Sequence, residues 1–133
     1  MTTPPTSFPL TLLPGRYAVC RLRPDAPVPL WALKVNSQMS SVTRTPDELS
    51  VVCPEAAVPP FVNLAEKGWR AFKLEGPVPF TTTGVIAGLT VPLAAAGVGV
   101  FVLSTFDTDY LLVKEANLEK AQAALQAAGF TVR

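Results

Sequence analysis

Histidine is absent from this 133-residue sequence, and cysteine occurs only at Cys20 and Cys53. Because histidine is the most common general base and metal ligand at neutral pH, its absence excludes Ser-His-Asp and Cys-His catalytic sets. The two cysteines are too far apart for a CxxC motif or a zinc-ligand spacing. Each lies in an apolar run, which favours a small buried side chain over a disulfide. We therefore expect no metal, no cofactor and no catalytic residue.

Charged residues are also scarce, at 16% of the chain, and the two signs nearly cancel, with 11 Lys and Arg against 10 Asp and Glu. No basic stripe breaks this balance, so neither nucleic acid nor a membrane surface is expected as a partner. The first residues lack the basic and apolar regions of a signal peptide. A cytoplasmic location is expected.

The stretch between Glu75 and Asp107 contains no charged residue and is long enough to span a bilayer. Pro92 and Gly97 divide this stretch, however, and Val98–Leu103 has the length and β-branched content of a strand. We therefore predict a buried helix followed by a buried strand, and no membrane span.

Proline is abundant, with 14 residues that lie mostly before residue 80. The first half is therefore expected to be rich in loops and edge strands. Residues 1–9 are predicted to form a flexible N-terminus. Strands are predicted over Leu10–Leu13, Tyr17–Leu22, Met39–Thr45 and Glu48–Cys53, and short helices over Leu30–Val35 and Pro59–Lys67, the latter closed by Gly68.

The second half has a clearer pattern. A helix is predicted from Thr82 or Thr83, whose hydroxyls would cap it, with Ile86, Leu89, Leu93 and Ala96 on its buried face and Gly97 at its end. Strands are predicted over Trp69–Leu74, Val100–Leu103, Tyr110–Lys114 and Phe130–Val132, with a second helix capped by Asn117. The order β-α-β-β-α-β predicts a ferredoxin-like α+β sandwich, with two helices on one face of an antiparallel sheet.

A weaker copy of this pattern precedes it. The segment Thr43–Val52 (TRTPDELSVV) aligns without gaps on Ser104–Val113 (STFDTDYLLV), which pairs Glu48 with Asp109 and Leu49 with Tyr110. We infer a tandem duplication, with a first, abbreviated repeat over residues 10–67 and a second repeat over residues 68–133. The predicted strand at Leu10–Leu13 would replace the missing last strand of the first repeat.

The segment WRAFKLEGPVPFTTTGVIAGLTVPLAAAGVGVFVLSTFDTDYLLVKEANLEKA resembles the ACT-domain superfamily of amino-acid-binding regulatory modules. It is most similar to small bacterial tandem-ACT proteins, which are related to the ACT repeats of the cytosolic arginine sensor of animals. The segment SVTRTPDELSVVCPE extends the resemblance into the first half. The resemblance implies an ACT-type ferredoxin-like sandwich that senses a small amino acid.

A ligand site is predicted where the helix start meets the turn Ser104–Asp109. Free N–H groups at the start of the helix would hold an anion such as an α-carboxylate. Asp109 or Asp107 would take an ammonium or guanidinium group, and Phe106 would supply an apolar wall. The resemblance to the arginine sensor implies ligand contacts from Thr82, Thr83, Gly84, Thr105, Phe106 and Asp109. This chain has hydroxyls where the sensor has an acidic residue, and Thr108 where it has an aromatic, so an amino acid is implied without specifying arginine.

The sequence leaves three functions open. A non-enzymatic sensor would bind a small amino acid or related metabolite between the two repeats, and its exposed sheet edge would allow a homodimer. A structural or protein-interaction module would have the same fold without a ligand, with Asp107 and Asp109 as ordinary turn formers. An enzyme would need these two carboxylates as acid and base, but nothing beside them would make one the acid and the other the base. We expect the sensor.

Overall fold

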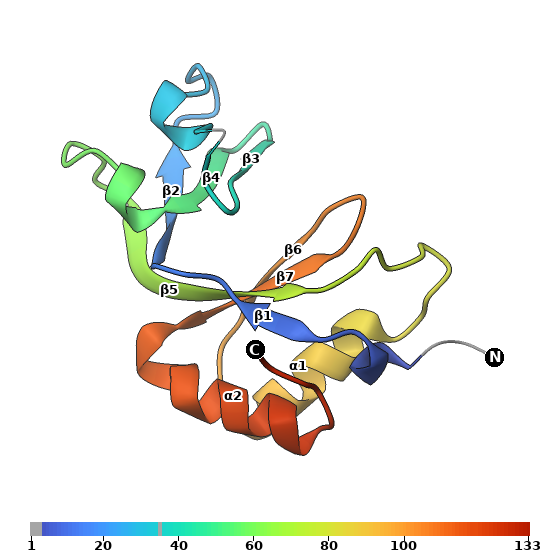
Figure 1. Ribbon diagram of the computed structural model, residues 1–133. Coiled ribbons are helices and arrows are strands. Elements are labelled where there is room, and N and C mark those ends of the chain that lie inside the picture. The colour runs from blue at the N-terminus through green and yellow to red at the C-terminus, as the bar shows by residue number, and fades with distance from the viewer. Residues whose placement is uncertain (1–3, 35) are drawn as a thin grey trace. The chain divides into compact units, whose positions relative to one another are not determined.

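The computed structural model describes residues 4–34 and 36–133 (Figure 1). The chain divides into two compact units. The first unit is Gly15–Trp69, and the second unit is discontinuous, combining the segment that ends at Pro14 with Arg70–Arg133. Strand β5, Ala65–Leu74, therefore contributes residues 65–69 to the first unit and residues 70–74 to the second.

The first unit is an antiparallel sheet whose helices are reduced to single turns. Its strands lie in the order β3–β4–β2–β5. Two 3-10 turns occupy the places that helices take in a βαββαβ unit. The remaining elements are β2 (Tyr17–Leu22), η2 (Leu30–Ala32), β3 (Ser41–Arg44), β4 (Leu49–Pro54) and η3 (Glu55–Ala57). The first repeat is thus abbreviated in its helices and retains its strands.

Both cysteines lie in the core of the first unit, with Ala18, Ala32 and Val51. They are free and buried. Burial raises the pKa of both thiols, that of Cys53 to about 11, so both are protonated at neutral pH. Their role as small buried side chains agrees with the sequence prediction.

The second unit has two helices on one face of its sheet (Figure 1). Strand β1 pairs with β5, and β5, β7 and β6 follow in that order. Val132 forms a parallel bridge to Leu10 on the other side of β1. The elements are η1 (Pro5–Ser7), β1 (Leu10–Leu12), α1 (Val85–Ala95), β6 (Phe101–Ser104), β7 (Asp109–Lys114), η4 (Glu115–Asn117) and α2 (Leu118–Ala127). The predicted ferredoxin-like α+β class is confirmed.

Helix α1 begins differently from the prediction. Its N-cap residue is Gly84, in the left-handed conformation with φ 78°, and no side chain caps it. Thr82 and Thr83 therefore do not serve as caps. The buried residues Val85, Leu89 and Leu93 are spaced four residues apart. Leu89 and Leu93 were predicted on this face, whereas Val85 takes the place predicted for Ile86. Pro92 lies inside the helix, as predicted.

Residues 4–9 of the segment predicted to be a flexible N-terminus lie against the second unit, and residues 1–3 lie outside the described part of the chain. Pro5 packs so closely on α1 that a Cβ added at Gly88 would lie 3.2 Å from it. The N–H of Glu75 donates to the Pro9 carbonyl at 2.7 Å. The segment is therefore part of the second unit.

Strand β1 corrects the predicted repeat boundary. Leu10, Thr11 and Leu12 pair with residues 72–74 of β5, so β1 does not replace a strand of the first repeat. The last strand of the first repeat is instead formed by residues 65–69 of β5, which pair with β2. The helix predicted over residues 59–67 is accordingly wrong. Gly68 has φ 79° inside the strand, where a register shift marks a bulge.

The predicted alignment of the two hairpins is wrong by one residue. The N–H of Thr45 donates to the Glu48 carbonyl at 2.9 Å, and the N–H of Thr105 donates to the Thr108 carbonyl at 2.8 Å, so these two turns superimpose. Arg44 pairs with Leu49 directly before and after the first turn, as Ser104 pairs with Asp109 around the second. Leu49, not Glu48, is the counterpart of Asp109.

Candidate functional site

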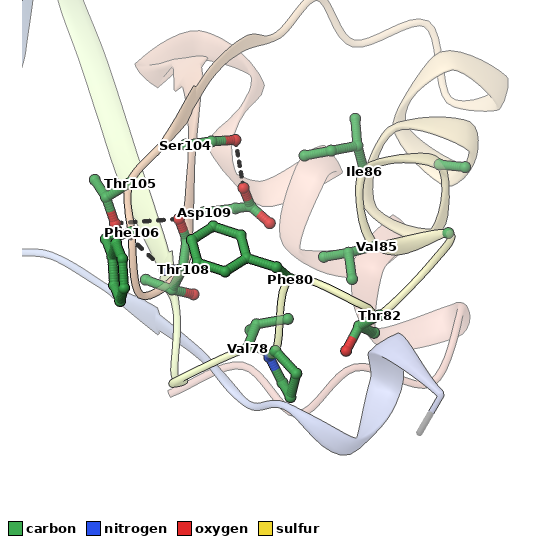
Figure 2. Close-up of a pocket in the computed structure, with 13 residues that line it drawn as sticks. Val78, Phe80, Thr82, Val85, Ile86, Ser104, Thr105, Phe106, Thr108 and Asp109 are labelled. Atoms are coloured by element: carbon green, nitrogen blue, oxygen red, sulfur yellow. Dashed lines mark hydrogen bonds between the residues drawn. The ribbon is translucent and has the colours of Figure 1, made fainter. Parts of the chain in front are cut away.

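An open pocket of about 450 Å³ lies between the start of α1 and the β6–β7 turn (Figure 2). One wall is the loop and first turn that lead into α1, and the other is the turn between β6 and β7. It is lined by Val78, Pro79, Phe80, Thr82, Gly84, Val85, Ile86, Ala87, Ser104, Thr105, Phe106, Thr108 and Asp109. All of these residues belong to the second unit. The pocket is therefore built by the second repeat, although a site shared by both repeats was expected.

The two walls are joined at their base by two hydrogen bonds. The Thr108 hydroxyl donates to the carbonyl of Leu74 at 2.5 Å, and its side chain is buried, with 6% of the residue exposed. The N–H of Val78 donates to the carbonyl of Asp107 at 2.7 Å. Both bonds join the turn to the end of β5 and the loop that follows it, and they connect the two walls at the base of the pocket.

Asp109 is the one charged residue among the described residues that line this pocket. It is half-buried, and one of its carboxylate oxygens accepts a hydrogen bond from the Ser104 hydroxyl at 2.5 Å. The other oxygen points toward α1 in Figure 2. A carboxylate held in this way is oriented to receive a cationic group that enters the pocket.

The opposite wall presents the start of α1. The backbone N–H groups of Val85, Ile86 and Ala87 have no partner within the helix, since they belong to its first turn. The aligned peptide dipoles add a partial positive charge at this end. The pocket therefore places an anion-attracting helix start opposite a carboxylate.

Two aromatic rings meet at the mouth of the pocket. Phe80 comes from the loop and Phe106 from the turn, and their ring centroids are 5.0 Å apart in an edge-to-face arrangement. They are 74% and 81% exposed. Such rings offer apolar surface and a π face to a bound molecule.

The structure brings together five of the six residues predicted for ligand binding. Thr82, Gly84, Thr105, Phe106 and Asp109 line the pocket, whereas Thr83 is exposed and does not line it. Asp107, the alternative cation partner, lines a smaller polar pocket with Lys73 and Glu75.

Sequence reasoning missed Phe80, Ser104 and Thr108 as residues of this site. Ser104 carried a usable signal, because it ends a strand directly before the polar turn. Phe80 lies between a proline and a run of threonines in a loop, where no periodicity indicates the direction of a side chain.

Two family models match this chain, and each covers mainly one of the two units. Residues 64–127 match the family model of an ACT domain, and residues 15–60 match the model of a family-specific N-terminal domain. A segment of 88 residues, 59% of the chain, is 31% identical to the bovine (Bos taurus) cytosolic arginine sensor for mTORC1, subunit 1. That segment is 27% of the sensor's length, so this chain spans about a quarter of it.

Solved structures are similar over nearly the whole chain. A protein from Agrobacterium tumefaciens is 40% identical, with a TM-score of 0.87 over 95% of this chain and 92% of that one. The ligand-free regulatory subunit of aspartate kinase from Thermus thermophilus has a TM-score of 0.63 over 90% of this chain and 96% of its own. At 15% identity, the second likeness concerns the fold alone.

No helix among the described residues combines the length and apolar character that crossing a membrane requires.

Proposed function

Because this chain belongs to the ACT-domain superfamily, we propose that it is a non-enzymatic regulatory module that binds a small amino acid in the pocket of its second unit. One observation carries the proposal: the Asp109 carboxylate and the uncapped start of α1 face the same pocket. A free amino acid carries both complementary charges on one small molecule. The name of one similar protein, the bovine cytosolic arginine sensor, supports the same class of ligand.

In the proposed complex, the α-carboxylate of the ligand accepts hydrogen bonds from the N–H groups of Val85, Ile86 and Ala87. Its ammonium group, or a cationic side chain, pairs with Asp109, which the Ser104 hydroxyl orients. The hydrocarbon part of the ligand lies against Val85 and Phe106. We further propose that the protein acts in the cytoplasm, as the name of the sensor states for that protein.

A regulatory role is favoured over catalysis by the composition of the pocket. Asp109 is the only ionisable side chain among its described lining residues. General acid–base chemistry on an amino acid needs a second titrating group or an activated nucleophile within reach of the first. A single carboxylate suits binding.

A second candidate function is a protein-interaction module without a ligand. The exposed rings of Phe80 and Phe106 favour it, because paired aromatic rings at a surface are typical contacts of a protein partner. In this case, the hydrogen bond between Ser104 and Asp109 would only stabilise the hairpin.

A thermal-shift screen against the standard amino acids, each at millimolar concentration, separates the two. A ligand at 100 times its dissociation constant adds about 2.7 kcal/mol to the free energy of unfolding, which raises Tm by several degrees. We expect at least one amino acid to do so. Asp109→Asn should abolish the shift, because the ligand's cation loses its partner.

Asp107→Asn is the matched control, because Asp107 lies in the same turn and does not line the pocket. We expect this variant to retain the shift. Equal losses in both variants, or no shift with any amino acid on the folded protein, would argue for the interaction module.

A further inference from the structure

The hairpin of the first unit lacks the polar pair that faces the pocket in the second unit. Arg44 and Leu49 stand where Ser104 and Asp109 stand in the other hairpin, because both pairs flank equivalent turns. Leu49 is completely buried. An apolar side chain in the core therefore replaces the carboxylate that could receive a cation.

Arg44 extends from this hairpin to a loop. Its Nη1 donates to the carbonyl of Pro24, and its Nη2 donates to the carbonyl of Ala26 at 2.7 Å. Both carbonyls belong to the loop that follows β2, the first strand of its repeat. The corresponding loop of the second unit follows β5 and carries Val78 and Phe80, which line the pocket.

The same space between hairpin and loop is therefore used differently in the two units. In the second unit it is an open pocket of about 450 Å³. In the first unit, the exposed guanidinium of Arg44 joins the hairpin to the loop by two hydrogen bonds. Two carbonyl oxygens suit a guanidinium, because its planar fork directs separate N–H groups at separate acceptors and is more weakly hydrated than an ammonium.

We propose that the carbonyls of Pro24 and Ala26 form a guanidinium-binding niche in the first unit and that Arg44 is its built-in occupant. The niche is the first unit's counterpart of the second unit's pocket, and Arg44 takes the place that a separate molecule would take. The proposal depends on contacts within the first unit alone, so it stands whether or not the second unit binds an amino acid.

The test empties the niche and refills it with a small probe. Arg44→Ala removes the guanidinium, and methylguanidinium is then added at millimolar concentration to the 133-residue protein. The readout is the backbone carbonyl chemical shift of Pro24 and Ala26, measured by carbon-detected NMR because Pro27 has no N–H to report on Ala26. We expect the substitution to move both signals and methylguanidinium to return them toward their original positions.

Three controls make the result specific. Wild-type protein should not respond at the same concentration, because its niche is occupied. Methylammonium should not restore the signals, because it lacks the planar fork. Arg23→Ala removes an exposed guanidinium from the same loop, where it pairs with Asp25 at 3.2 Å, and should not create a response to methylguanidinium.

The proposal is overturned if Arg44→Ala leaves both carbonyl signals unchanged, or if methylguanidinium acts equally on the wild type and the variant. Restoration by methylammonium to the same extent would also overturn it. If the alanine variant does not fold, Arg44→Lys keeps the charge and the long stem. We expect this variant to move the same two signals; unchanged signals would contradict the niche.

Discussion

At the scale of single residues, Thr108 connects the pocket to the rest of the second unit. Its buried hydroxyl donates to the Leu74 carbonyl and thereby holds the turn against the end of β5. Thr108→Val keeps the shape of the side chain and leaves that carbonyl without its donor. We expect the free energy of unfolding to fall by about 1–3 kcal/mol.

Urea unfolding measures this loss, and Thr90→Val provides the comparison. The Thr90 hydroxyl donates to the Ile86 carbonyl within its own helix at 2.8 Å, near solvent. We expect this substitution to change stability by less than about 0.5 kcal/mol. Equal effects at the two positions would show that the bond to Leu74 has no special weight.

The sequence allowed part of the pocket to be predicted residue by residue. Asp109 and Phe106 were found because a charged and an aromatic residue stand out in a polar turn between apolar strands. Thr83 was misplaced, because nothing in a run of three threonines indicates which one faces inward. The capping role expected for Thr82 and Thr83 was wrong because Gly84 adopts a left-handed conformation that starts the helix without a side chain.

At the scale of elements, Gly84 decides where α1 begins and hence where its free N–H groups point. Any other residue is strained at φ 78°, although a Cβ there would meet no atom within 4 Å. We expect Gly84→Ala to cost about 1 kcal/mol of stability and to weaken the proposed binding of an amino acid, because the first turn must shift.

Gly99→Ala is the matched control for this substitution. A Cβ at Gly99 would also meet no atom within 4 Å, and its φ lies outside the left-handed range. We expect a neutral effect or a gain of up to about 1 kcal/mol, because alanine restricts the unfolded chain. Chemical unfolding of both variants checks the pair, and a Gly84→Ala protein as stable as the wild type would contradict the role of the left-handed start.

Elements with strong periodicity were predicted, and those fixed by distant pairing were not. Both helices of the second unit and its central hairpin were predicted in place, although Ile86, predicted on the buried face of α1, is exposed and Val85 is buried instead. Residues 59–67 were predicted as a helix closed by Gly68, but residues 65–69 pair with β2, and Gly68 serves a bulge. Pairing with a strand far away in the sequence overrode the local pattern there.

The one-residue error in the alignment of the two hairpins has a similar origin. Either register places Val51 and Val52 on apolar residues of the second hairpin, so composition does not separate them. The turns separate them, because Thr45 and Thr105 make the same hydrogen bonds to the third residue after them. The alignment set by the turns matches Asp109 with Leu49 and not with Glu48. The error matters because a shift of one residue exchanges the two faces of a strand.

At the scale of the whole molecule, the second unit is assembled from both ends of the sequence. Strand β1 pairs with β5 on one side, and Leu10 forms a bridge to Val132 on the other. Leu10 lies in the core and is 1% exposed. A chain that starts at Gly15 would lose these pairs and leave buried apolar surface uncovered. We expect such a chain to lose cooperative unfolding, as followed by circular dichroism during urea titration.

Adding back a synthetic peptide of residues 4–14 tests whether the loss is due to the missing strand. We expect the peptide to restore part of the cooperative transition, and a peptide carrying Leu10→Asp to fail, because a carboxylate would enter the core. A shortened chain with an unchanged midpoint would show that the second unit does not need β1.

The parallel pairing of β1 with the last residues also determines how the second unit would respond to mechanical force. The N–H of Leu10 donates to Thr131, the N–H of Arg133 to Leu10, and the N–H of Leu12 to Arg133, each at 2.8 Å. Because the two segments run in the same direction, tension applied through residues 10 and 133 pulls them past each other along their length. The three bonds would then bear the load together and break at once, rather than open one after another as in a zipper.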